Sequence, residues 1–119
     1  RILAKRSIHD FYKNQLKNYS NVSFLDEPEG FFSSRWLTCI YTDSFKTREK
    51  IRLELESNDI ESRPLWKPLH KQPLYKECEK YVDGTSEDLF EKGLCLPSGT
   101  GLTNEELYKI VETIKFALG

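Results

Sequence analysis

The chain has 119 residues, which suits one domain with its own core and is too short for a two-domain enzyme. Hydrophobic residues at 38% and charged residues at 31% are typical of a soluble globular protein, and no apolar run approaches the roughly 20 residues that cross a bilayer. The formal net charge of -1 leaves no excess of basic residues to hold a phosphate backbone, so we expect neither a membrane nor a nucleic-acid partner.

The first predicted element is an amphipathic helix from Ile2 to about Tyr19, because its apolar residues recur at steps of three and four. His9 lies among the lysines of the polar side, and we expect it to be in solvent. Residues 22–24 alternate as a short strand. Residues 26–30 then form a polar turn whose carboxylates have no apolar surroundings to raise a pKa.

Residues 35–41 are dense in aromatic and β-branched side chains, which predicts a central strand and the best-buried one of the sheet. A helix follows and runs to about residue 57, where Asn58 and Asp59 close it. Its first free amides can be capped by Asp43, Ser44 or Thr47. Its predicted inner face consists of Phe45, Ile51 and Leu55.

Residues 60–69 cannot lie inside a helix, because Pro64 and Pro68 lack an amide donor and favour an extended residue before them. We therefore expect an extended segment at an edge of the sheet. A helical stretch should follow from residue 73 to about residue 82, and Gly84 should end it.

Residues 86–92 predict a further helical turn or two, stopped by a glycine, and residues 94–96 predict a short buried strand. The last helix has the clearest start signal, because Thr103 and Glu106 fit a capping box. Its apolar stripe is formed by Leu107, Ile110, Val111, Ile114, Ala117 and Leu118.

Segments with strand and helix periodicity alternate along the chain, which predicts an α/β (α+β) sandwich with helices mainly on one face of a small mixed or antiparallel sheet. We divide it into an entry helix (residues 1–20) and a body of sheet and packing helices (residues 21–119). The cysteines are odd in number and form no Cys-x-x-Cys pair, so we expect reduced thiols in a cytoplasmic protein. They are Cys39, Cys78 and Cys95.

Two motif blocks are more specific than the periodicity. Residues 63–70 read Arg-Pro-Leu-Trp-Lys-Pro-Leu-His, and residues 93–101 read Gly-Leu-Cys-Leu-Pro-Ser-Gly-Thr-Gly. In these blocks the chain resembles the carboxy-terminal small domain of the DegT/DnrJ/EryC1/StrS nucleotide-sugar aminotransferases, which depend on pyridoxal phosphate and have fold type I. It looks closest to members that aminate C4 of a UDP-linked 4-keto sugar on the way to bacillosamine-type sugars.

The resemblance implies a full-length enzyme that transfers an amino group from glutamate to a nucleotide-linked keto sugar in surface or capsular polysaccharide biosynthesis. It also implies a cytoplasmic homodimer whose cofactor site lies in an amino-terminal domain that this chain lacks. Pyridoxal phosphate needs a lysine amine and a carboxylate against its ring nitrogen. Because no segment here resembles the family's lysine-bearing loop, we expect this chain alone to be inactive and to hold no cofactor.

Three motif residues are candidate substrate contacts, each with a structural alternative. Arg63 could bind a diphosphate or carboxylate through two hydrogen bonds, or form an ion pair with Glu61. Trp66 could be a flat wall against the sugar, or fill the core. His70 could donate to a substrate oxygen, or be a hydrogen-bonded structural residue. The loop 98–101 could hold an anion, or set the entry angle of the last helix.

Two other classes of function stay open at this point. The chain could be a free-standing interaction module derived from the same domain, in which an exposed apolar face binds a partner. It could also be a small self-sufficient enzyme that uses His70 with Cys78 or Cys95, which requires a thiol within hydrogen-bonding reach of the imidazole. No catalytic residue or cofactor ligand is assigned within the chain, because no segment resembles the family's lysine-bearing loop. No metal ligand is assigned either, since no set of side chains has metal-binding spacing.

Overall fold

A four-stranded antiparallel sheet forms the centre of the protein, seen in a computed structural model that describes residues 1–75, 77, 79 and 83–119. Its strands are β1 (Val22–Ser23), β2 (Thr38–Thr42), β3 (Arg63–Pro64) and β4 (Gly93–Leu96), and their order across the sheet is β1-β2-β4-β3. All three pairings are antiparallel. The predicted sandwich with a small antiparallel sheet is therefore confirmed.

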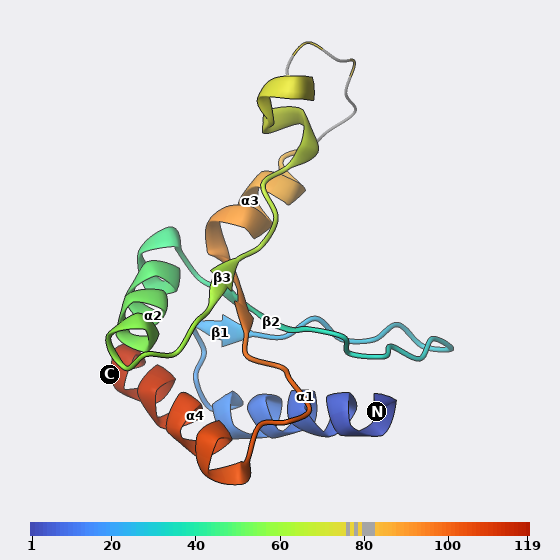
Figure 1. The fold of residues 1–119 in the computed structure, drawn as a ribbon. Coiled ribbons are helices and arrows are strands. Elements are labelled where there is room, and N and C mark those ends of the chain that lie inside the picture. The colour runs from blue at the N-terminus through green and yellow to red at the C-terminus, as the bar shows by residue number, and fades with distance from the viewer. Residues whose placement is uncertain (76, 78, 80–82) are drawn as a thin grey trace.

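Three helices share one hydrophobic core with the sheet (Figure 1). They are α1 (Ile2–Leu16), α2 (Phe45–Ser57) and α4 (Asn104–Leu118). Side chains alternate between the two faces of a strand, and the buried apolar residues of β2 and β4 are Ile40, Leu94 and Leu96. The remaining helix, α3 (Thr85–Lys92), directly precedes β4. None of the helices in the described part is both long and apolar enough to cross a membrane.

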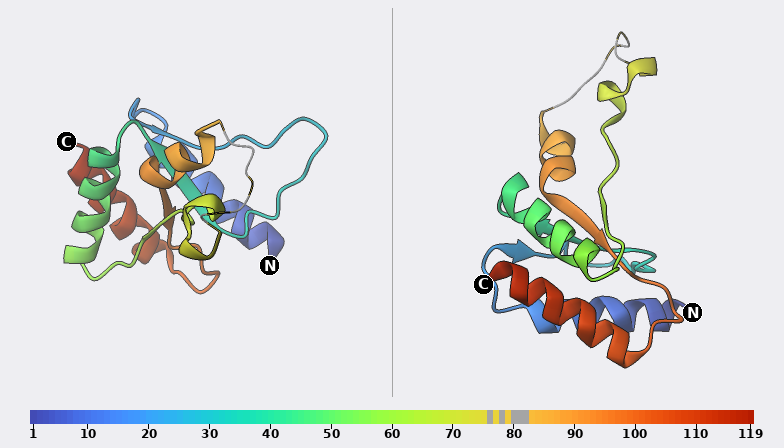
Figure 2. Two further views of the ribbon diagram at one scale, coloured as in Figure 1. Left: turned by 90° about the horizontal axis from the view of Figure 1, so that it is seen from above. Right: turned by 60° about the vertical axis from the view of Figure 1, so that its left-hand side comes forward.

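Two segments extend away from this packed body. The β1–β2 loop, residues 24–37, projects in Figure 1 and in the left view of Figure 2. The arm, which we define as residues 65–75 and 83–92, projects in Figure 1 and in the right view of Figure 2. It contains the 3-10 helices η1 (Leu69–Lys71) and η2 (Pro73–Tyr75) together with α3.

The base of the arm depends on a glycine. A Cβ atom at Gly93 would lie 2.4 Å from Leu65 Cδ1 and 2.6 Å from the backbone oxygen of Leu89. Neither distance is compatible with van der Waals contact. The close approach of Leu65 and α3 to β4 at this point therefore requires the residue that has no side chain.

Local signals predicted the helix starts and the edge strand correctly. Ser44 caps α2 by accepting a hydrogen bond of 3.1 Å from the Thr47 amide. Thr103 and Glu106 form the expected capping box, with bonds of 3.1 and 2.9 Å. β3 contains Pro64 and lies at the edge of the sheet, as the missing amide donor requires.

Some expectations from the sequence were wrong. The central strand begins at Thr38 instead of residue 35, and the Trp36 side chain is 67% exposed. Phe45 is 46% exposed, so it does not belong to the inner face of α2. Arg48 is buried there instead, because its guanidinium donates to the Phe90 carbonyl at 2.7 Å while lying over the Phe45 ring.

His9 was also placed wrongly, because it is 4% exposed instead of solvated. Its ring lies edge-on to Phe24 at 5.6 Å between centroids, so the start of the β1–β2 loop covers it. Burial lowers the pKa of His9. The helix expected from residue 73 to about residue 82 is observed as a 3-10 helix over Pro73–Tyr75. Residues 76, 78 and 80–82 of the expected range lie outside the described residues.

Candidate pocket beside the edge strand

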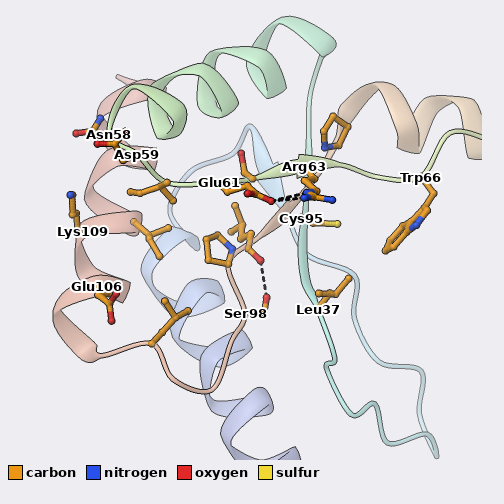
Figure 3. A pocket seen from close by; sticks show the side chains of 17 residues that line it. Leu37, Asn58, Asp59, Glu61, Arg63, Trp66, Cys95, Ser98, Glu106 and Lys109 are labelled. Carbon is orange, nitrogen blue, oxygen red and sulfur yellow. Dashed lines mark hydrogen bonds and ion pairs between the residues drawn. The ribbon is translucent and has the colours of Figure 1, made fainter.

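A pocket of about 870 Å³ lies beside β3 (Figure 3). This volume is within the range of small-molecule sites in proteins. Its walls come from the α2–β3 connection, the edge strand, the β4–α4 loop and α4. The polar side chains that line it are Asn58, Asp59, Glu61, Ser62, Arg63, Ser98, Glu106 and Lys109.

The first wall exists because α2 ends sharply. The Asn58 amide donates to carbonyls of the last helical turn, and Asp59 adopts a left-handed conformation with φ of 59°. This reversal sends residues 60–64 back along the sheet. Pro64 has no amide hydrogen to offer a further strand, and among the described residues β3 is the edge strand next to which the pocket lies.

The floor is the loop after β4, and it is held by hydrogen bonds from distant elements. Ser98 Oγ accepts from the Thr38 amide at 2.9 Å and donates to the Leu96 carbonyl at 2.8 Å. Tyr12 Oη donates to the Pro97 carbonyl at 2.7 Å, and Lys5 Nζ donates to the Ser98 carbonyl at the same distance. The Ser98 hydroxyl therefore serves the backbone, which favours the structural role for loop 98–101.

Arg63 lines the pocket and also forms the ion pair that was its structural alternative. Its Nε and Nη2 atoms both lie 2.8 Å from Glu61 Oε1. Both side chains are about three-quarters exposed, so this pair adds little stability. It orients the guanidinium, and Nη1 has no hydrogen-bond partner among the described residues.

Trp66 and His70 have different environments. Trp66 lines the same pocket and is 68% exposed, so the interpretation that it fills the core is wrong. His70 lies on η1 in the arm, and its Nε2 is 2.7 Å from Glu87 Oε1 on α3. The imidazole thus connects two parts of the arm and does not line the pocket. Of the three candidates, the structure brings together Arg63 and Trp66 only.

The small-enzyme hypothesis requires a thiol that hydrogen-bonds to His70. Cys95 Sγ instead contacts Cys39 Sγ at 3.3 Å, and His70 is bonded to Glu87. Among the described residues, the imidazole therefore has no thiol partner. Cys78, the other thiol of this hypothesis, lies outside the described residues.

The pocket contains residues that were not singled out from the sequence. Asn58 and Asp59 were identified only as a helix stop, and Glu106 only as a capping residue. The backbone amide of Thr103 lowers the pKa of Glu106, because a hydrogen bond to the carboxylate favours its charged form. Lys109 follows Glu106 by three residues on the same exposed helix face, a spacing that could have indicated a shared polar surface.

Known proteins resemble this chain in fold and in sequence. A family model described as "DegT/DnrJ/EryC1/StrS aminotransferase family" matches residues 1–115. EpsN of Bacillus subtilis (strain 168) is 38% identical over 118 residues, which cover 96% of this chain and 30% of EpsN. GDP-perosamine synthase of Escherichia coli O157:H7 is 36% identical over 114 residues, covering 95% of this chain and 30% of the synthase.

A solved structure agrees with these matches. The crystal structure of a DegT DnrJ EryC1 StrS aminotransferase from Brucella abortus has a TM-score of 0.86 and 26% identity, covering 100% of this chain and 31% of that one. This chain therefore spans about 30% of the length of the curated relatives that it matches.

The pocket does not fit pyridoxal phosphate, the cofactor that the resemblance implies. That cofactor needs a desolvated lysine amine and a carboxylate against its ring nitrogen. Lys109 is the lysine among the lining residues, and it is exposed, as are the carboxylates of Asp59, Glu61 and Glu106. Every other described lysine is also at least partly exposed. The arrangement can bind and orient a ligand, but the described residues do not supply this cofactor's donor set.

Proposed function

Because this chain belongs to the DegT/DnrJ/EryC1/StrS aminotransferase family, we propose that it is the carboxy-terminal small domain of a pyridoxal phosphate-dependent sugar aminotransferase. The full-length enzyme would transfer an amino group from glutamate to a nucleotide-linked keto sugar in the cytoplasm, for surface or capsular polysaccharide. The observation that carries the proposal is the family match over residues 1–115, in a chain that spans about 30% of its relatives' length.

In this proposal the chain contributes binding groups, and the cofactor is held by residues outside it. Arg63 would bind the diphosphate of the sugar nucleotide through the edge of the guanidinium that Glu61 does not occupy. Trp66 would offer an exposed flat surface on which a sugar ring or a base can lie. His70 would act indirectly, by holding η1 against α3 and so keeping the arm in shape.

Exposed apolar side chains support the proposal that other protein surfaces cover parts of this chain. They are concentrated on the two segments that project from the body (Figure 1). Such surfaces are usually covered by other protein. In the proposed enzyme they would contact the amino-terminal domain and the second subunit of a homodimer. The side chains are Leu25, Phe31, Phe32 and Trp36 on the β1–β2 loop and Trp66, Leu69, Leu74 and Leu89 on the arm.

The same exposed side chains are the observation that favours the second candidate, an interaction module without catalysis. The two candidates differ in what the gene encodes upstream of Arg1. An α/β domain with a lysine-bearing cofactor loop in the same reading frame supports the aminotransferase. A start codon directly before Arg1 supports the module.

The decisive experiment measures amino transfer from glutamate to nucleotide-linked 4-keto sugars by the full-length protein. We expect Arg63→Ala to raise the KM for the sugar nucleotide by roughly tenfold or more, since a charge-assisted hydrogen bond is worth about 1.5–3 kcal/mol, while kcat changes less. Arg52→Ala is the matched control, because Arg52 forms ion pairs on α2 outside this pocket. Unchanged kinetics in Arg63→Ala would assign this arginine to structure, and an absence of amino transfer with every keto sugar would refute the proposed function.

A further inference from the structure

Cys39 and Cys95 lie directly opposite each other on the two interior strands of the sheet. They are paired in the antiparallel register of β2 and β4, and their Sγ atoms are 3.3 Å apart. Both side chains are half-buried. Since neighbouring residues alternate between faces, they lie on the face opposite Ile40 and Leu94, away from the helical core.

The backbone at this position already suits a disulfide. Residues directly opposite in an antiparallel pair have Cα atoms about 4.5 or 5.5 Å apart, and disulfides accept Cα separations of about 4.4–6.8 Å. Bond formation therefore needs only side-chain rotation that brings the two sulfur atoms from 3.3 Å to about 2.0 Å. The strands can keep their register.

The two thiols are not equivalent. The contact between the two sulfur atoms lowers the pKa of Cys95 and raises that of Cys39. Arg63 is the register partner of Cys95 on β3, so Cys39, Cys95 and Arg63 form one row across the same face of the sheet. Cys95 also lines the pocket, where Figure 3 shows it beside Arg63. A small oxidant in the pocket would therefore meet Cys95 first.

We propose that Cys39 and Cys95 form a dithiol modification site that hydroperoxides convert into a cross-strand disulfide. The Cys95 thiolate attacks a peroxide oxygen, the O–O bond breaks, and the leaving oxygen takes a proton, giving Cys95 sulfenic acid and, from hydrogen peroxide, water. Cys39 sulfur then attacks Cys95 sulfur, the S–O bond breaks, and hydroxide leaves with the thiol proton as a second water. The two thiols lose two electrons together, and one peroxide is reduced. This inference does not rest on the proposed aminotransferase activity.

The test treats the complete folded polypeptide that carries this chain with stoichiometric hydrogen peroxide, blocks remaining thiols and maps tryptic peptides by mass spectrometry. Trypsin separates the three cysteines into the peptides 36–46, 77–80 and 93–109. We expect peptides 36–46 and 93–109 to be joined, with a mass lower by two hydrogens, and dithiothreitol to release them. Cys39→Ser should abolish the joined species and leave a sulfenic acid on Cys95 that dimedone traps.

Cys78→Ser is the matched control, and it should form the joined species as the wild type does. Circular dichroism of each variant establishes that it is folded, and the wild-type peptide map does not depend on any variant. The proposal is overturned if both thiols stay alkylatable after peroxide treatment. It is equally overturned if the disulfide that forms joins Cys78 to either partner, or if it joins two molecules.

Discussion

Replacing Tyr12 with phenylalanine tests how α1 supports the floor of the pocket. The Tyr12 side chain is fully buried, and its hydroxyl donates to the Pro97 carbonyl at 2.7 Å across 85 residues of sequence. Burial raises the pKa of Tyr12, so the hydroxyl stays protonated and able to donate at neutral pH. Phenylalanine keeps the ring and leaves no large cavity, so the change isolates one hydrogen bond.

The expected cost follows from the carbonyl that is left behind. An acceptor that loses its partner inside a protein costs about 1–3 kcal/mol, and the Pro97 site is only half-buried, so we expect about 1–2 kcal/mol. For a chain of 119 residues, this corresponds to a decrease in Tm of roughly 4–8 °C. Urea unfolding should show a lower midpoint with an unchanged slope.

Tyr108→Phe is the matched control. Tyr108 is 50% exposed on α4, and its ring packs edge-on against Phe11 at 5.0 Å, a contact that phenylalanine keeps. Its free energy of unfolding should stay within about 0.5 kcal/mol of the wild type. If Tyr12→Phe is no less stable than Tyr108→Phe, the bond to Pro97 does not support the floor and the reasoning is refuted.

Three further predictions concern a helix cap, a carboxylate and the cofactor. Thr103→Ala should lower the free energy of unfolding by about 1 kcal/mol, with Thr103→Ser largely restoring it; equal midpoints for all three proteins would contradict the capping box. The Arg6 guanidinium and the Ser33 amide lower the pKa of Glu27 to about 2, so its stabilising contribution is complete above the ordinary pKa near 4.5 and is lost as the pH falls towards 2. NMR titration of the Glu27 carboxyl checks this, and an ordinary midpoint in the folded protein would contradict it. The isolated chain mixed with pyridoxal phosphate and borohydride should yield no lysine labelled stoichiometrically, whereas a single fully labelled lysine would show that it holds the cofactor itself.

Most element types followed from residues that are neighbours in the chain. Thr103 and Glu106 are three residues apart, and the hydrogen bonds that they predict form within one helical turn. Pro64 predicts an edge strand because it lacks an amide hydrogen, whatever surrounds it. Signals of this kind are complete within a few residues, so the structure agrees with them.

The errors concern positions whose surroundings come from elsewhere in the chain. His9 has lysines on its helix face, yet Phe24 of the β1–β2 loop covers it. Tryptophan is a residue type that often fills a core, but Trp66 lies at the base of the arm, where it is exposed and lines a pocket. Arg48 replaces Phe45 inside because the Phe90 carbonyl, 42 residues away, accepts its hydrogen bond.

The alternation of helices and strands, the edge position of β3, the capping of α4 and, through two motif blocks, the resemblance to the family could all be read from the amino-acid sequence. The structure was needed to show that Arg63 and Trp66 share a pocket from which His70 is separated, and that Cys39 faces Cys95. For the two cysteines, the reason is strand register. A shift of one residue between β2 and β4 would place the two thiols on opposite faces of the sheet, and register depends on core packing across the whole chain.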